Sequence, residues 1–139
     1  LGNICRSPTA EGVLRGLDPN LTVDSAGTSG WHVGDPPHRD AIRAAHQRGY
    51  DISGQRGRAF GPADFDAFDL ILAMDAKNLR DIEMQRPDGN TTPVRLMLDF
   101  SPSHQGQDVP DPYYSGNFDH VLDLIEDAAA GVLRTHGRA

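Results

Sequence analysis

The first eleven residues constrain this chain more than any other stretch, because they combine a loop able to hold an anion with the start of a helix. They read Leu-Gly-Asn-Ile-Cys-Arg-Ser-Pro-Thr-Ala-Glu. Gly2 and Asn3 tolerate the positive φ angles of a tightly curled loop, whose backbone N–H groups can point inward at an oxyanion. Arg6 adds a planar fork of donors that can bind two phosphate oxygens at once. The segment therefore predicts an oxyanion site.

The residues that follow this loop predict a helix from Pro8 to about residue 16. Proline suits a first helical turn, where N–H groups have no intrahelical acceptor. Ser7 is placed to act as the N-cap, and Glu11 falls in the predicted first turn. The positive end of the helix dipole would then point at the same anion as the loop.

Short apolar segments alternate with helical patterns along the rest of the chain. Strands are predicted at 21–25, 68–74 and 94–98, and helices at 35–48, 62–65, 77–84 and 118–133. The run 70–74 is apolar without alternation, as expected of a strand buried on both faces. This order predicts an α/β fold, a three-layer sandwich with a central parallel sheet and helices on both faces.

Composition narrows the class of protein further. The length of 139 residues predicts one domain, and the net charge of −7 argues against a nucleic-acid partner. A single cysteine excludes a disulfide framework or a multi-cysteine metal site, and the histidines form no paired set. We therefore expect no metal, no cofactor and a cytoplasmic location. The longest apolar run is too short to span a membrane.

The run Gly-Asn-Ile-Cys-Arg-Ser-Pro-x-Ala-Glu resembles the phosphate-binding loop of the low-molecular-weight protein tyrosine phosphatases. In that family the loop is Cys-x5-Arg-Ser, and its first cysteine attacks phosphorus. Counting five residues back from Arg6 reaches Leu1, so the resemblance places the nucleophile directly before Leu1. Cys5 matches the second loop cysteine. We therefore expect residues 1–139 to form one such domain that lacks its first strand and nucleophile, and to be inactive as written.

The resemblance also implies a role for each site residue. Arg6 would hold the transferring phosphoryl group, and Asp111, in Asp-Pro-Tyr-Tyr, would protonate the leaving oxygen. Asp108 is the other carboxylate of that loop and the alternative acid. The remaining implied residues fall into three groups, namely the phosphate cradle (Leu1, Gly2, Asn3, Ile4, Cys5, Ser7), the aromatic wall of the cleft (Trp31, Tyr113, Tyr114) and the support of the loop (Ser25, Asp75).

Several of these residues have a plainer interpretation. Without the resemblance, Trp31 reads as a core side chain, Ser25 as part of a turn, Asp75 as a helix N-cap, and the Asp-Pro-Tyr-Tyr motif as a turn. Many family members carry a histidine about where this chain has Gln55, which cannot titrate. Arg58 either anchors that loop or is solvated.

The expected function is hydrolysis of phosphotyrosine in proteins through a phosphocysteine intermediate. Partners would be phosphotyrosine-containing proteins, with phosphate and other oxyanions as competitors, and neither nucleic acid nor a membrane. Three alternatives remain. An arsenate reductase needs further cysteines for its redox relay, and a protein arginine phosphatase carries Thr where this chain has Ile4. A non-catalytic phosphate-binding module would not need the acid Asp111.

Overall fold

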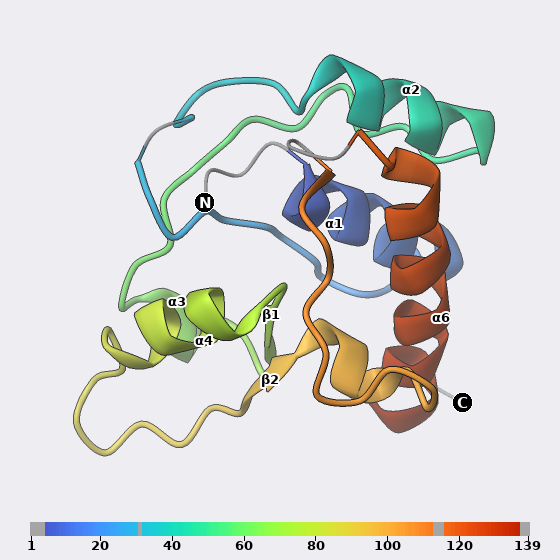
Figure 1. Cartoon of the computed structure of the whole chain (residues 1–139). Coiled ribbons are helices and arrows are strands. Elements are labelled where there is room, and N and C mark those ends of the chain that lie inside the picture. The colour runs from blue at the N-terminus through green and yellow to red at the C-terminus, as the bar shows by residue number, and fades with distance from the viewer. Residues whose placement is uncertain (1–4, 31, 113–115, 137–139) are drawn as a thin grey trace.

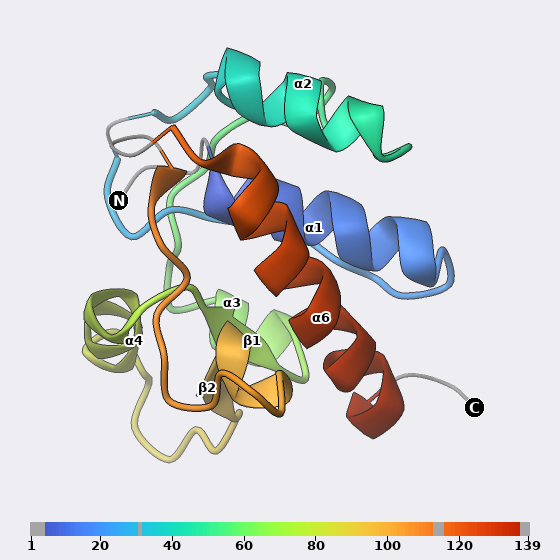
Figure 2. The same ribbon diagram turned by 45° about the vertical axis from the view of Figure 1, so that its right-hand side comes forward.

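Two short parallel strands lie at the centre of the protein, between two groups of helices (Figures 1 and 2). The computed structural model describes residues 5–30, 32–112 and 116–136. In chain order its elements are the helices α1 (Arg6–Leu17), α2 (Arg39–Gln47) and α3 (Asp64–Ala67), strand β1 (Ile71–Ala73), helix α4 (Ala76–Glu83), strand β2 (Val94–Leu96), the 3₁₀ helix η1 (Met97–Phe100) and helix α6 (Phe118–His136).

The side chains of the β1 segment alternate between two hydrophobic clusters. Strand β1 pairs in parallel with β2, with Ile71 opposite Val94. Leu72 and Met74 pack into the cluster formed with α1, η1 and α6. Ile71 and Ala73 pack into a second cluster with residues of α3 and α4. Since successive strand residues point to opposite faces, the sheet is covered on both sides, which confirms the predicted α/β sandwich.

Helix α6 forms one wall of the molecule and packs against α1, α2 and η1 (Figure 1). Ile125 and Ala129 are completely buried on its inner face, as the spacing of apolar residues predicted. At Gly131 the helix passes so close to η1 that an added Cβ would collide with the carbonyl oxygen of Phe100. Because Gly131 has no side chain, the backbones of α6 and η1 can come into direct contact here. No helix in the described part of the chain is long and apolar enough to cross a membrane.

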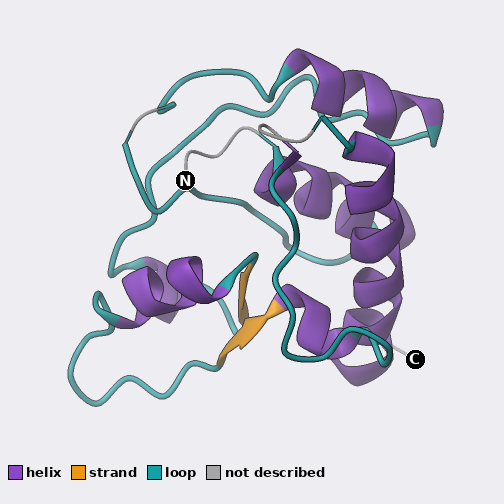
Figure 3. Cartoon of the chain, viewed as in Figure 1, coloured by secondary structure: helices purple, strands orange, loops and turns teal. Residues whose placement is uncertain are grey.

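Two predicted strands differ from the structure. Residues 21–25 are extended but form no strand, and nearby only Gly27 makes an isolated parallel bridge, to Ala59. A strand is defined by a hydrogen-bonded neighbour, and sequence periodicity does not say whether one lies alongside. The predicted strand 94–98 is shorter, because Met97 turns the chain into η1. Loops therefore make up much of the chain, as Figure 3 shows.

The start of α1 also differs from the prediction. The helix begins at Arg6, with Cys5 as an N-cap that makes no side-chain capping bond, so Ser7 is not the cap. Pro8 takes the third helical position, which is allowed because none of the first four N–H groups has an intrahelical acceptor. Glu11 consequently lies beyond the first turn. The earlier start places the Arg6 side chain at the very end of the helix.

The remaining helices lie close to where the sequence places them. Helix α2 is capped by His38, whose ring nitrogen accepts from the Asp40 amide at 3.0 Å. It ends before Gly49, which has a φ of +88°. Asp75 caps α4, as predicted.

Candidate functional site

Arg6 joins three segments of the chain at the N-terminus of α1. Its Nη1 donates to Asp75 Oδ2 at 2.8 Å and to the carbonyl oxygen of Val109 at 2.8 Å. Its Nη2 lies 4.0 Å from Asp111 Oδ2. The side chain is only 8% exposed. Both Nη1 hydrogens are therefore committed to the protein, and among the described residues the Nε hydrogen has no acceptor. The Nε–Nη2 edge is the one that can form a bidentate contact with an oxyanion.

Asp75 has two functions in this arrangement. Its Oδ1 accepts a hydrogen bond from the Asn78 amide at 2.7 Å and so caps α4. Its Oδ2 accepts a hydrogen bond from Arg6 Nη1. Burial alone would raise the pKa of Asp75, but the Asn78 amide and the Arg6 guanidinium outweigh burial and hold its pKa below the usual value. The carboxylate is thus charged and fixes the arginine side chain in one position.

Asp111 lies at the end of a loop that is tied to the carboxyl end of β1. The amide of Val109 donates to the carbonyl oxygen of Met74 at 2.7 Å, and Asp108 Oδ1 accepts from the amide of Ala76 at 2.9 Å. Asp108 therefore binds the first turn of α4. The structure thus brings together Arg6, Asp75 and Asp111, which the sequence analysis assigned to one site.

Cys5 is buried beside this cluster. Burial, together with the negative charge of Asp111, raises the pKa of its thiol to about 12, although Arg6 acts in the opposite direction. At neutral pH this cysteine is a thiol and hence a poor nucleophile. Ser7 is half-buried and lines a cavity next to the helix start. The predicted site residues Leu1, Gly2, Asn3, Ile4, Trp31, Tyr113 and Tyr114 lie outside the described residues.

Ser25 lies against the flank of α1. Its hydroxyl donates to Glu11 Oε1 at 2.7 Å. Glu11 is 6% exposed, and burial raises its pKa, although Ser25 and Arg15 act in the opposite direction. Sequence reasoning gave Glu11 only a role at the helix start. A signal was available, since Glu11 lies three residues before Leu14 and therefore shares a helix face with that buried apolar residue.

The loop 50–58 packs on α1 through Gln55 and on the extended segment through Arg58. Gln55 Nε2 donates to the carbonyl oxygen of Pro8 at 3.0 Å. Its side-chain oxygen is buried, and no described residue forms a hydrogen bond with it. Arg58 Nε donates to Asp24 Oδ2 at 2.9 Å, and its Nη2 lies 3.0 Å from Asp64 Oδ1. Of the two alternatives for Arg58, the anchoring role is the one the contacts support.

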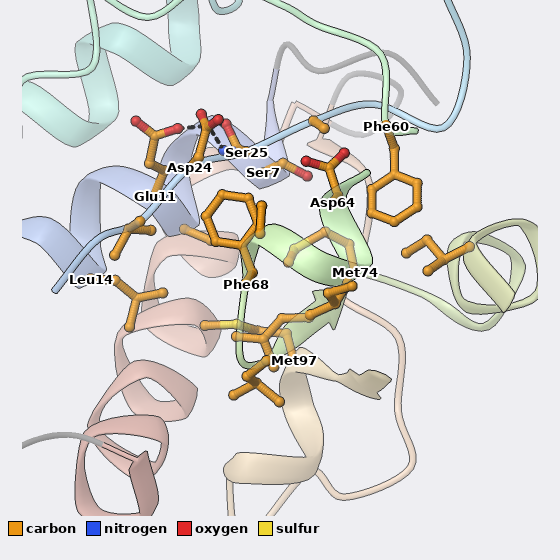
Figure 4. Close-up of a pocket in the computed structure, with 18 of the residues that line it drawn as sticks. Ser7, Glu11, Leu14, Asp24, Ser25, Phe60, Asp64, Phe68, Met74 and Met97 are labelled. Atoms are coloured by element: carbon orange, nitrogen blue, oxygen red, sulfur yellow. Dashed lines mark hydrogen bonds between the residues drawn. The ribbon is translucent and has the colours of Figure 1, made fainter. Parts of the chain in front are cut away.

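A cavity of about 350 Å³ separates the extended segment 21–26 from strand β1 (Figure 4). Its walls are mostly apolar and include Leu14, Phe68, Met74 and Met97. Polar side chains, among them Ser7, Glu11 and Ser25, gather at the end next to α1. The cavity thus runs along the edge of β1 that does not pair with β2.

The class of protein follows from where these groups lie. In parallel α/β proteins, ligands bind at the carboxyl ends of the strands, and an arginine at a helix N-terminus beside an acidic group is suited to phosphate esters. No group of three or more potential metal ligands occurs in residues 5–30, 32–112 or 116–136. The position of Arg6 beside Asp111 at the N-terminus of α1 is that of an α/β enzyme that acts on phosphate esters.

Residues 1–138 match the family described as low molecular weight phosphotyrosine protein phosphatase, and the chain belongs to that family. The slr0328 protein of Synechocystis, named for the same family, is 46% identical over 147 residues, which cover 99% of this chain and 93% of that protein. The crystal structure of YfkJ from Bacillus subtilis superposes with a TM-score of 0.89 at 39% identity, covering 97% of this chain and 89% of that one. Vibrio vulnificus Wzb, in complex with benzylphosphonate, gives 0.85 at 32% identity, covering 96% and 92%.

Proposed function

We propose that the protein hydrolyses phosphotyrosine in proteins through a phosphocysteine intermediate. The observation that carries this proposal is the position of Arg6, which is held by Asp75 and Val109 at the start of α1 with Asp111 4.0 Å away. Membership of the family supports a protein substrate with an aryl phosphate. The complex of the related Wzb with benzylphosphonate, a phosphonate next to a benzene ring, supports the same class of ligand.

In the first step, a cysteine thiolate attacks phosphorus and the bond between phosphorus and the tyrosine oxygen breaks. Asp111 donates its proton to that oxygen, so that tyrosine leaves as a neutral phenol. The Nε–Nη2 edge of Arg6 binds two of the phosphoryl oxygens, where charge accumulates in the transition state. The positive end of α1 adds to this stabilisation.

In the second step, water attacks the phosphocysteine. Asp111, now a carboxylate, accepts the proton of the water, the sulfur–phosphorus bond breaks, and phosphate and the thiolate are released. One residue thus acts first as acid and then as base, so Asp111 must stay close to the phosphoryl group throughout. Phosphate and other oxyanions would occupy the same position as competitive ligands.

We place the nucleophile directly before Leu1, and not at Cys5. The raised pKa of Cys5 keeps it protonated at neutral pH. The spacing back from Arg6 points to the position before Leu1. The cavity beside β1 supports a preceding strand, because it is apolar and has Ser7 at the end next to the site. Reading a residue other than cysteine before Leu1 in the gene would replace the enzyme by a phosphate-binding module.

The lone cysteine also favours this function over an arsenate reductase, and it supports the cytoplasmic location that we propose. Ile4 favours an aryl substrate over phosphoarginine. Both alternatives can be tested directly by comparing turnover of a phosphotyrosine peptide, a phosphoarginine peptide and arsenate with the full-length protein. Hydrolysis of only the phosphotyrosine peptide is the expected result.

The role of Asp111 is tested by Asp111→Asn in the full-length protein. With phenyl phosphate, whose leaving group is basic, turnover should fall about 10²–10³-fold, as is typical when an acid catalyst is lost. With p-nitrophenyl phosphate, whose leaving group needs no proton, the pre-steady-state release of nitrophenol, which reports formation of the phosphocysteine, should fall much less. Binding of inorganic phosphate, measured by calorimetry, should change little. Equal losses for both esters would remove Asp111 from the acid role.

A further inference from the structure

Three hydrogen bonds fix the start of the segment that carries Asp111. The preceding residues 102–107 form turns and are largely exposed. At the next residues, Asp108 Oδ1 accepts from the amide of Ala76 at 2.9 Å, and the Val109 amide donates to the carbonyl oxygen of Met74 at 2.7 Å. The carbonyl oxygen of Val109 in turn accepts a hydrogen bond from Arg6 Nη1 at 2.8 Å. These bonds fix the position of the chain at Asp108 and Val109, shortly before Asp111.

The N-terminus of α4 binds two carboxylates with different tasks. Asp75 accepts from the Asn78 amide and pairs with Arg6. The amide of Ala76, which is the first residue of the helix and has no intrahelical acceptor, is satisfied by Asp108. Both carboxylates are favoured by the positive end of the helix dipole. One helix end therefore fixes Arg6 and the segment of the acid at the same time.

The residues between Asp108 and Asp111 make the position of Asp111 depend on that of Asp108. Pro110 and Pro112 flank Asp111, and each fixes its own φ angle. Residues 108–112 are consequently restricted in how they can bend, and a shift at Asp108 moves the Asp111 carboxylate relative to Arg6. Pro112 is completely buried, which restricts the other end.

We infer that Asp108 is a positioning residue, which holds the Asp111 carboxyl at its distance from Arg6 by binding the first amide of α4. The inference rests on the proposed function, and it gives Asp108 a role other than that of the alternative acid. The carboxylate of Asp108 accepts an amide hydrogen and touches neither Arg6 nor the phosphoryl position. Its loss should therefore impair proton transfer and leave oxyanion binding intact.

The test compares Asp108→Ala with Asp99→Ala in the full-length protein. Asp99 is a matched control, because its Oδ1 also accepts a backbone amide, that of Gly106, at 2.7 Å, in an exposed turn of the same connection. For Asp108→Ala, turnover of phenyl phosphate should fall roughly 10-fold, since small displacements of a catalytic group are costly. The pre-steady-state release of nitrophenol from p-nitrophenyl phosphate, which reports only formation of the phosphocysteine, and the phosphate dissociation constant should change less than about twofold. Asp99→Ala should change none of these.

Asp108→Asn provides the second measurement, because asparagine keeps an oxygen that can accept from Ala76. It should recover most of the phenyl phosphate turnover. Equal losses on both esters for Asp108→Ala, or a loss as large for Asp99→Ala, would show general destabilisation and overturn the inference. A wild-type protein that hydrolyses neither ester would instead refute the proposed function, and the two failures are thus distinct.

Discussion

Helix α1 carries two buried ionisable side chains, Arg6 at its N-terminal end and Glu11 on its flank. The two side chains differ in how well their surroundings compensate the charge. At the end, Arg6 is matched by Asp75 and by the carbonyl of Val109, and the pKa of Asp75 is lowered. On the flank, Glu11 faces the cavity, and burial raises its pKa. The Glu11 carboxylate accepts a hydrogen bond from the Ser25 hydroxyl and pairs with Arg15, which is 56% exposed.

The comparison shows under which conditions this fold tolerates a buried charge. A buried charge is tolerated when a partner and hydrogen bonds replace the water it has lost, and otherwise its neutral form is favoured. The helix end meets this condition, and it is where the oxyanion site is proposed. The flank meets it only partly, and it borders the cavity in which we propose a preceding strand. The following predictions test this contrast.

The largest effect is expected for Arg6→Lys. Lysine keeps the charge but cannot bind Asp75, the Val109 carbonyl and two oxyanion oxygens in one plane. Turnover of an aryl phosphate by the full-length protein should fall about 10³-fold, in the range seen when a transition-state donor is removed. Arg15→Lys, on the same helix and exposed, is the control and should keep its turnover. Retention of most activity in Arg6→Lys would mean that Arg6 does not hold the phosphoryl group.

Asp75→Asn should have the next largest effect, on stability. Asparagine still caps α4, so the loss isolates the pair with Arg6, and we expect about 2 kcal/mol in urea unfolding at pH 7. Asp81→Asn breaks the exposed pair of Lys77 and Asp81 on the same helix and should cost only about 0.3 kcal/mol. Similar losses for the two variants would contradict the contrast between buried and exposed pairs.

The pH dependence of this loss has a definite sign. Because the pKa of Asp75 is lower in the folded state than its ordinary value of 3.8, its contribution is present above that value. It disappears as the pH falls through the folded pKa. The wild type and Asp75→Asn should therefore converge in stability under acid conditions.

Glu11→Gln should have the smallest effect and the opposite sign. The folded pKa of Glu11 lies above its ordinary value of 4.5, so the carboxylate costs stability once the pH exceeds that value, and the cost levels off above the folded pKa. Glutamine can still accept from Ser25 but carries no charge. The melting temperature at neutral pH should rise by at most a few degrees, with no gain at low pH. A lower melting temperature at neutral pH would mean that the Glu11 charge is stabilising.

The sequence predicted those features of the fold and site that depend on local patterns. The apolar run 70–74 indicated burial on both faces, and Asp75 followed by Asn78 indicated a cap. The start of α1 was misplaced, because proline fits any position of a first turn and not only the first. A strand at 21–25 was predicted from composition, although a strand requires a neighbour that local sequence does not reveal.

The contacts that complete the site were beyond sequence reasoning for a different reason. Arg6 meets Asp75 and Val109 across 69 and 103 residues of chain. The Val109 contact uses a backbone carbonyl, which has no signature in the sequence. The attachment of Asp108 to Ala76 is hidden in the same way, because the amide at a helix start is common to every residue type except proline.

The two hydrogen bonds of Arg6 Nη1 also affect the entropy and the rate of oxyanion binding. A free arginine side chain loses about 2 kcal/mol of rotamer entropy when it is fixed in one geometry. In this protein the loss has already occurred on folding, because Asp75 and Val109 hold the guanidinium. An arriving oxyanion thus meets an oriented fork and needs no search by the side chain. Capture should be limited by diffusion and desolvation, with little side-chain ordering on the protein side.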